Sequence, residues 1–212
     1  MMKRGFTLIE ILISVGIFSV VMVIALGALL SVSAAERKGE TLKSVINNLD
    51  FALESMSRTI RTGVYYHCDT TSIPGSGELT PQDCASAPGS NFFIFKANDA
   101  VNPYTVYCLS GSSIWRLQAS TLSGLSTSCG SSSYLQMTAP EVKVTNLTFY
   151  VLGSLGYPSG GSSACSSPPG GSDCIQPKVV MAVSGYVSLG DVSSTTSTFN
   201  VQTTVTQRLY DQ

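Results

Sequence analysis

A mostly apolar run near the start of the chain, Phe6 to Leu30, limits more than any other feature what this sequence can fold into. The twenty residues from Ile11 to Leu30 carry no charge. A helix of that length reaches about 30 Å, the thickness of the hydrocarbon core of a bilayer. The run therefore predicts a membrane-spanning helix. Glu10 stands inside it, and a carboxylate there is costly unless it finds a partner, so Glu10 is a candidate functional residue.

Two cations precede this run and predict its orientation in the membrane. Lys3 and Arg4 belong to a short leader, Met1 to Gly5, and positive charge favours the cytoplasmic side. We therefore expect a single-pass protein whose N-terminus is cytoplasmic and whose larger part is exported. The alternative is a secretory signal that is removed, for which Ser33 to Ala35 would supply the small residues of a cleavage site.

The eight residues from Lys3 to Glu10, KRGFTLIE, resemble the class III signal of type IV pilins and pseudopilins. The resemblance implies that a prepilin peptidase and methyltransferase cuts after Gly5 and methylates Phe6, the new N-terminus. It also implies that Glu10 pairs with the N-terminal amine of a neighbouring subunit and sets the axial register during assembly. The alternative is that Glu10 lies in the headgroup region and has no specific partner.

After the apolar run the helical pattern continues in an amphipathic form. Seven apolar residues recur at three- and four-residue steps and share one helical face. They are Leu42, Val45, Ile46, Leu49, Leu53, Met56 and Ile60. Gly63 is placed to follow the helix end, so Phe6 to Thr62 is expected to form one helix. Its apolar face is expected to pack under a sheet, or in part to contact neighbouring subunits.

The chain is therefore expected to have four parts. These are a leader at 1–5, a transmembrane and assembly helix at 6–35, an amphipathic helix at 36–63 and a globular domain at 64–212. The last part is long enough to bury a core of its own. Runs of apolar residues alternate there with segments rich in Ser, Gly and Pro, which predicts an antiparallel β domain.

Six segments of this domain are predicted to be strands. Residues 92–96 form a compact apolar strand, and Tyr104–Leu109 and Ile114–Gln118 are expected to form a hairpin. Residues 179–189 and 199–209 alternate in polarity and are expected to pair antiparallel, beside a strand at 147–151. In that strand, Thr148 and Tyr150 are expected to meet solvent. The order of long helix, variable loops and antiparallel strands resembles the pilin fold, an α+β architecture.

All six cysteines follow the apolar run. They are Cys68, Cys84, Cys108, Cys129, Cys165 and Cys174. An even number confined to the exported part predicts disulfides that tie the loops in an oxidising compartment. Six cysteines allow 15 pairings, and sequence does not choose among them, although pairing in sequence order would close three local loops. A zinc site is the competing interpretation, but no C-x-x-C pair is present and His67 is the single histidine.

Composition favours assembly over catalysis. With one histidine, a histidine-based triad has no identifiable acid partner, so we expect neither an enzyme nor a cofactor or metal site. The net charge of −1 disfavours direct binding of nucleic acid, which relies on many phosphate contacts.

The resemblance then implies a minor pilin or pseudopilin of the bacterial inner membrane, most similar to J-like pseudopilins or W-like minor pilins. Its domain would lie in the periplasm or outside the cell, and the subunit would enter a type IV pilus or a type II secretion pseudopilus, in its initiating or tip complex. Its partners would be other pilin subunits, the prepilin peptidase, the inner-membrane assembly platform and, before assembly, membrane lipid. The alternatives are a major pilin and a membrane-anchored extracellular binding protein or adhesin.

Overall fold

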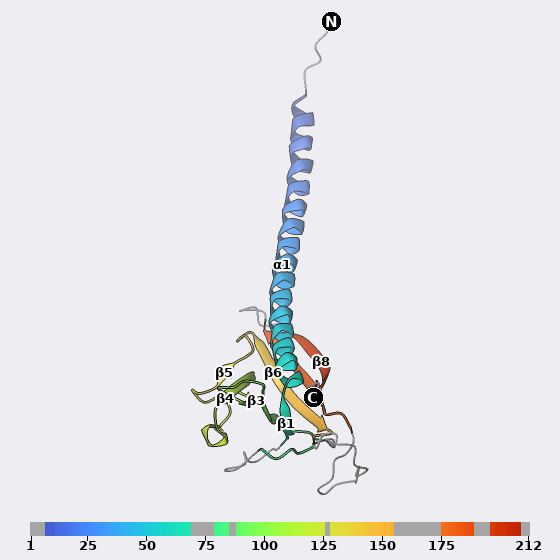
Figure 1. Cartoon of the computed structure of the whole chain (residues 1–212). Coiled ribbons are helices and arrows are strands. Elements are labelled where there is room, and N and C mark those ends of the chain that lie inside the picture. Colours follow the sequence, from blue (N-terminus) through green and yellow to red (C-terminus); the bar gives the residue numbers. More distant parts are fainter. Residues whose placement is uncertain are drawn as a thin grey trace. The chain divides into compact units, whose positions relative to one another are not determined.

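The structure, a computed structural model, describes residues 7–68, 79–84, 88–125, 128–154, 175–188 and 196–208. The chain divides into two compact units, residues 1–44 and 45–212. In their described parts, the first unit consists of helix, and the second combines the end of that helix with eight strands (Figure 1). This agrees with the α+β architecture expected for a pilin fold.

Helix α1 runs from Leu8 to Arg61 without interruption. Three glycines lie within it, Gly16, Gly27 and Gly39, and none has a neighbouring group within 4 Å of the position that a side chain would occupy. Each glycine weakens a helix by about 1 kcal/mol relative to alanine, yet α1 continues through all three. The observed helix falls short of the expected one, Phe6 to Thr62, by Thr7 and Thr62, and Phe6 lies outside the described residues.

In the second unit, one face of α1 is buried in the domain. Val45, Leu49, Leu53, Met56 and Ile60 are at most 6% exposed, as their helical spacing predicted. Ala52 is also buried. Ile46 was assigned to the same face and is 46% exposed, so that assignment is wrong. Direction on the helix does not explain this, because Leu53 points within about 20° of Ile46 and is 6% exposed; Ile46 instead lies at the start of the part of α1 that belongs to the second unit.

The first sheet has five antiparallel strands in the order β1-β2-β3-β4-β5. They are β1 (Val64–His67), β2 (Phe92–Lys96), β3 (Tyr104–Ser110), β4 (Ser113–Ala119) and β5 (Leu135–Gln136). The expected hairpin is β3–β4, and it turns through Gly111 and Ser112, both with positive φ, as a two-residue hairpin loop requires. A short 3₁₀ helix, η1 (Leu122–Gly124), follows β4.

The second sheet has three antiparallel strands, β6 (Val142–Leu152), β7 (Lys178–Ser188) and β8 (Thr196–Thr206). The expected pairing of the last two strands is therefore confirmed, and β6 lies beside β7 as expected. Thr148 was expected to meet solvent, and this is wrong: it is 8% exposed, because the backbone around Gly89 packs against this face of β6.

Apolar side chains fill both faces of the first sheet. On one face, Phe93 stacks on Phe95 and, across to the second sheet, on Phe149, with ring centroids 5.3 and 5.2 Å apart. On the other face a second cluster is buried. It comprises Leu79, Ile94, Val106, Cys108, Leu117, Leu122, Leu125 and Tyr134. Burial on both faces explains why residues 92–95 are apolar without alternation.

Gly185 of β7 occupies a position where no larger residue fits. It faces Val144, next to the bulge at Thr145, and a side chain there would overlap the Lys143 carbonyl and the Phe199 ring. Since one of the obstacles is backbone, the sheet itself would have to shift. Gly185→Ala is therefore expected to lower the free energy of unfolding by about 2 kcal/mol.

Denaturant unfolding of the full chain in detergent tests this expectation. The control is Ser184→Ala on the same strand, where the change is expected to stay within about 0.5 kcal/mol because this side chain lines an open surface. Equal midpoints for the two variants would contradict the close packing at Gly185.

Candidate functional site: the N-terminal signal and the tied domain

Glu10 lies in the first turn of α1, where the helix is anchored by Thr7. The Thr7 carbonyl accepts the backbone N–H of Glu10 (3.1 Å) and of Ile11 (3.3 Å). The Glu10 side chain is exposed, and its neighbours Leu8 and Leu12 are 77% and 63% exposed. Gly5 and Phe6, the expected cleavage and methylation residues, lie outside the described residues. The structure therefore presents the carboxylate on the outside of an apolar helix end, available to another molecule.

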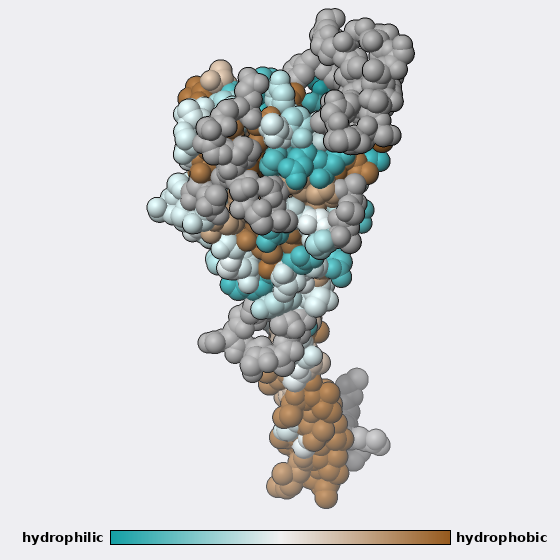
Figure 2. All heavy atoms as spheres, turned by 90° about the horizontal axis from the view of Figure 1, so that it is seen from below, coloured by the Kyte–Doolittle hydropathy of each residue, from teal (hydrophilic) through white to brown (hydrophobic). Residues whose placement is uncertain are grey.

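The surface of α1 after Glu10 suits a hydrocarbon environment. The large apolar side chains from Ile11 to Val32 are all exposed, and Figure 2 shows this segment as hydrophobic almost throughout. The Ser14 hydroxyl donates to the Ile11 carbonyl and the Ser19 hydroxyl to the Val15 carbonyl, so both are satisfied inside the helix. By length and composition, α1 could cross a membrane.

Two disulfides tie the globular domain, Cys68–Cys84 and Cys108–Cys129. Each bond joins a cysteine to the next cysteine along the chain, as pairing in sequence order would require. Cys165 and Cys174 lie outside the described residues, so the third pair stays a prediction. Cys108–Cys129 joins β3 to the segment that covers the second apolar cluster.

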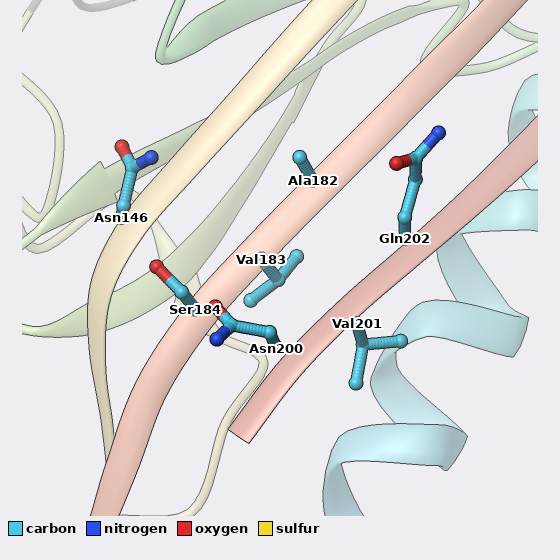
Figure 3. A pocket seen from close by; sticks show the side chains of 7 residues that line it. All are labelled: Asn146, Ala182, Val183, Ser184, Asn200, Val201 and Gln202. Atoms are coloured by element: carbon cyan, nitrogen blue, oxygen red, sulfur yellow. The ribbon is translucent and has the colours of Figure 1, made fainter. Parts of the chain in front are cut away.

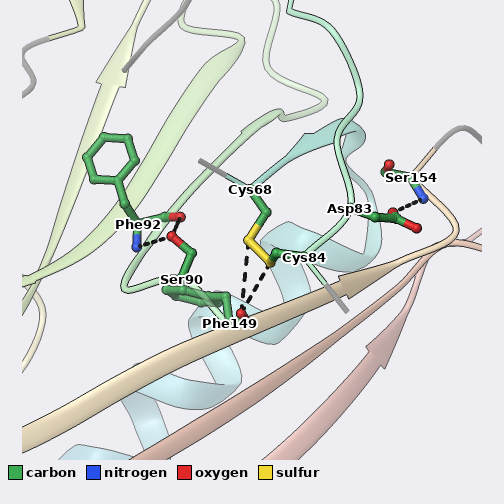
Figure 4. The surroundings of a disulfide bond; sticks show 7 residues. All are labelled: Cys68, Asp83, Cys84, Ser90, Phe92, Phe149 and Ser154. Atoms are coloured by element: carbon green, nitrogen blue, oxygen red, sulfur yellow. Dashed lines mark hydrogen bonds between the residues drawn. A yellow bond between two sulfur atoms is a disulfide. The ribbon is translucent and has the colours of Figure 1, made fainter. Parts of the chain in front are cut away.

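The Cys68–Cys84 bond lies where the two sheets meet (Figure 4). The backbone N–H of Gln82 donates to the Tyr66 carbonyl of β1, and the Gln82 carbonyl accepts the N–H of Cys68. The Cys84 N–H donates to the Val151 carbonyl of β6. The Cys84 sulfur lies 3.3 Å from the Phe149 carbonyl oxygen. Residues 79–84 therefore form a strap between the sheets, and the disulfide fastens one end of it.

Asp83 fastens the same strap to the end of β6, a role that sequence analysis missed. Its two carboxylate oxygens accept the backbone N–H groups of Gly153 (3.2 Å) and Ser154 (2.8 Å). Figure 4 shows the carboxylate turned toward Ser154. An isolated acid in a loop gives no sequence signal for such a contact, because its two partners are 70 and 71 residues away along the chain.

A shallow hollow of about 400 Å³ lies on the second sheet (Figure 3). Uncharged polar side chains line it, from Asn146 on β6, Ser184 on β7, and Asn200 and Gln202 on β8. Asn146 follows the bulge in β6, which opens the surface at that point. Amides and hydroxyls both donate and accept hydrogen bonds, so the hollow suits a neutral polar group.

The titratable side chains inside the domain serve packing. His67 is 3% exposed, and its Nδ1 lies 2.7 Å from the Thr80 carbonyl oxygen. Burial raises the pKa of Tyr134 to about 12 and also raises the pKa of Tyr107, so both phenols stay protonated at neutral pH. At the surface, hydrogen bonds from the backbone N–H groups of Val101 and Asn102 lower the pKa of Asp99. Among the described residues, no three His, Cys, Asp or Glu side chains gather as a metal site.

Comparison with known proteins finds a family match at the N-terminus. No curated protein and no solved structure matches the chain. Residues 1–34 match the family described as the prokaryotic N-terminal methylation motif. This segment includes Gly5, Phe6 and Glu10, and it continues into the apolar part of α1. The chain thus carries an N-terminal methylation motif, a class III signal that is consistent with type IV pilins and pseudopilins, and its α+β architecture fits the pilin fold.

Proposed function

We propose that this protein is a noncatalytic minor pilin or pseudopilin that assembles through α1 into a type IV pilus or a type II secretion pseudopilus. The observation that carries the proposal is the methylation motif at residues 1–34, with Glu10 exposed in the first turn of an apolar helix. A loop-rich domain tied by disulfides supports a minor role in the initiating or tip complex.

The proposal assigns a task to each part of the chain. The leader at 1–5 stays in the cytoplasm and is removed, and residues 6–35 hold the subunit in the bacterial inner membrane until it enters the filament. Residues 36–63 join this helix to the exported domain at 64–212, which faces the periplasm or the outside of the cell. Its partners are other pilin subunits, the prepilin peptidase and the inner-membrane assembly platform.

A membrane-anchored binding protein is the second candidate. The hollow on the second sheet favours it, because four uncharged polar side chains on neighbouring strands there could receive a neutral ligand. In that case α1 would act as an anchor, and Glu10 would have no partner.

Mass spectrometry of the mature N-terminus tests the assignment. We expect the chain isolated from cells that contain the peptidase to begin at a methylated Phe6. Gly5→Val places a branched side chain at the scissile bond and is expected to leave the leader attached. A wild-type chain that still begins at Met1, or one cut near Ala35, would contradict the pilin assignment.

A further inference from the structure

Two tyrosines and a lysine of the first sheet enclose a small cleft. Lys96, at the end of β2, pairs with Val64 of β1 on one side and with Tyr104 of β3 on the other. Tyr65 follows Val64, so the two phenol rings lie on either side of the lysine. The cleft has a volume of about 30 Å³, and Leu79 completes its lining. We call it the Tyr65–Lys96 cleft.

The backbone at Tyr65 is strained. Tyr65 has a φ of 58°, in the left-handed region that glycine adopts freely and bulky residues avoid. It sits in a bulge of β1, between the pairs Val64–Lys96 and His67–Ile94, where a left-handed residue is usually glycine. The chain therefore holds an aromatic side chain at a position where glycine would be less strained.

Core packing does not account for this tyrosine. The Tyr65 side chain is 47% exposed, whereas its neighbour Tyr66 is 1% exposed and donates its hydroxyl to the Ile60 carbonyl at 2.6 Å. Strained residues of this kind cluster at binding and catalytic sites. A binding role, in which the Tyr65 ring contacts a group outside the core, thus explains this tyrosine better than a role in the stability of the fold.

Lys96 supplies the charge of the cleft. Its Nζ lies 5.9 Å from the centre of the Tyr65 ring, within the range of a cation–π contact. Within the part of the chain that the structure describes, no carboxylate forms a salt bridge with Lys96. An ammonium group held over an aromatic face, with a second phenol beside it, is complementary to an anion.

The size of the cleft selects among anions. A volume of about 30 Å³ holds one or two water-sized groups, which is enough for a carboxylate. The rings of Tyr65 and Tyr104 can flank the short aliphatic stem that carries such a group, and their hydroxyls can donate to it. An Asp or Glu side chain has this shape and charge.

We propose that the Tyr65–Lys96 cleft receives an Asp or Glu side chain of a neighbouring subunit, which pairs with Lys96 between the two phenol rings. The proposal rests on the proposed function, because the assembly is what supplies the neighbour. It adds a contact of the globular domain to the contacts of α1 and gives Tyr65 its role as a positioning residue for Lys96.

Carbodiimide cross-linking of whole cells tests the proposal. The reagent joins Lys96 Nζ to a contacting carboxylate through an amide bond, and it takes up the water that is lost. We expect a cross-linked peptide that contains Lys96 and an acid of another pilin-like subunit. Lys96→Arg keeps the positive charge but forms no such amide, so it should abolish the product. Lys178→Arg is the control and should leave the product unchanged.

Tyr65→Gly separates the binding role from a structural one. It removes the ring and the strain together, so the thermal midpoint should stay equal or rise, while the yield of the cross-link falls about two- to fivefold, the size of an exposed cation–π contact. An unchanged yield, or a lowered midpoint with normal yield, would overturn the role of Tyr65.

Three other outcomes would overturn the proposed contact. They are a cross-link from Lys96 to an acid of this same chain, a product that persists in Lys96→Arg, and the absence of any protein attached to Lys96, which would leave a small anion as the occupant. The N-terminus is read from the same sample. If Phe6 is methylated and Lys96 is not cross-linked, the cleft proposal fails alone; if Phe6 is not processed, the proposed function fails.

Discussion

Replacing Glu10 by alanine is expected to reduce incorporation of the subunit into the filament roughly a hundredfold while leaving its insertion into the membrane intact. If the subunit assembles as proposed, the carboxylate lies among apolar helix surfaces and pairs with the Phe6 amine of a neighbour, where solvent screens the charges weakly. Removing one partner of a buried charge pair costs about 3 kcal/mol or more, since the other charge remains unpaired. Insertion is unaffected because alanine makes the run more apolar.

The ratio of the subunit in purified filament or pseudopilus to that in the membrane fraction measures this effect. Glu40→Ala is the matched control, since it removes an exposed carboxylate from the same helix and should leave the ratio unchanged. Glu10→Gln keeps the shape of the side chain and removes its charge. If Glu10→Gln assembles as well as the wild type, the pairing is not ionic and the proposed role of Glu10 is wrong.

The features that sequence analysis predicted are those with a local cause. The spacing of apolar residues along 42–60 predicted the buried face of α1, with the exception of Ile46. The hairpin was expected between Leu109 and Ile114, and its turn is shorter than expected, Gly111 and Ser112, because Ser110 and Ser113 pair with each other. The N-terminal signal was recognised because it is a short, contiguous motif, and residues 1–34 match the N-terminal methylation motif. The role of Glu10 within it stays a prediction. None of these inferences required knowledge of residues distant in the chain.

The features that it missed depend on contacts between distant segments. The division of the strands into two sheets, the strap at 79–84 and the burial of Thr148 all arise where segments far apart in sequence meet. Gly63 shows the same limit. Gly63 follows the helix end as expected. Glycine is needed there, however, because the Phe95 ring occupies the space that a side chain would fill. Likewise the Tyr65–Lys96 cleft depends on a bulge that strand patterns do not reveal.

The Cys68–Cys84 disulfide is expected to contribute about 3 kcal/mol to the free energy of unfolding, and the double substitution to alanine should remove it. The bond closes a loop with a sequence separation of 16 residues, and Cys108–Cys129 closes one of 21. In the chain-entropy account such similar loops stabilise by nearly equal amounts. The corresponding double substitution of Cys108–Cys129 is therefore a matched control for the global effect, and the two variants should unfold at similar denaturant concentrations.

Hydrogen exchange of the full chain in detergent should then distinguish the two bonds. Cys68–Cys84 fastens the strap between the sheets, so its loss should expose the backbone N–H groups that cross this junction, those of Gln82, residue 84 and Phe149. Loss of Cys108–Cys129 should leave them protected, because that bond lies on the other face of the first sheet. Equal protection of these three groups in both variants would show that the strap is held by its hydrogen bonds and by Asp83 alone, and that the disulfide acts only on the unfolded chain.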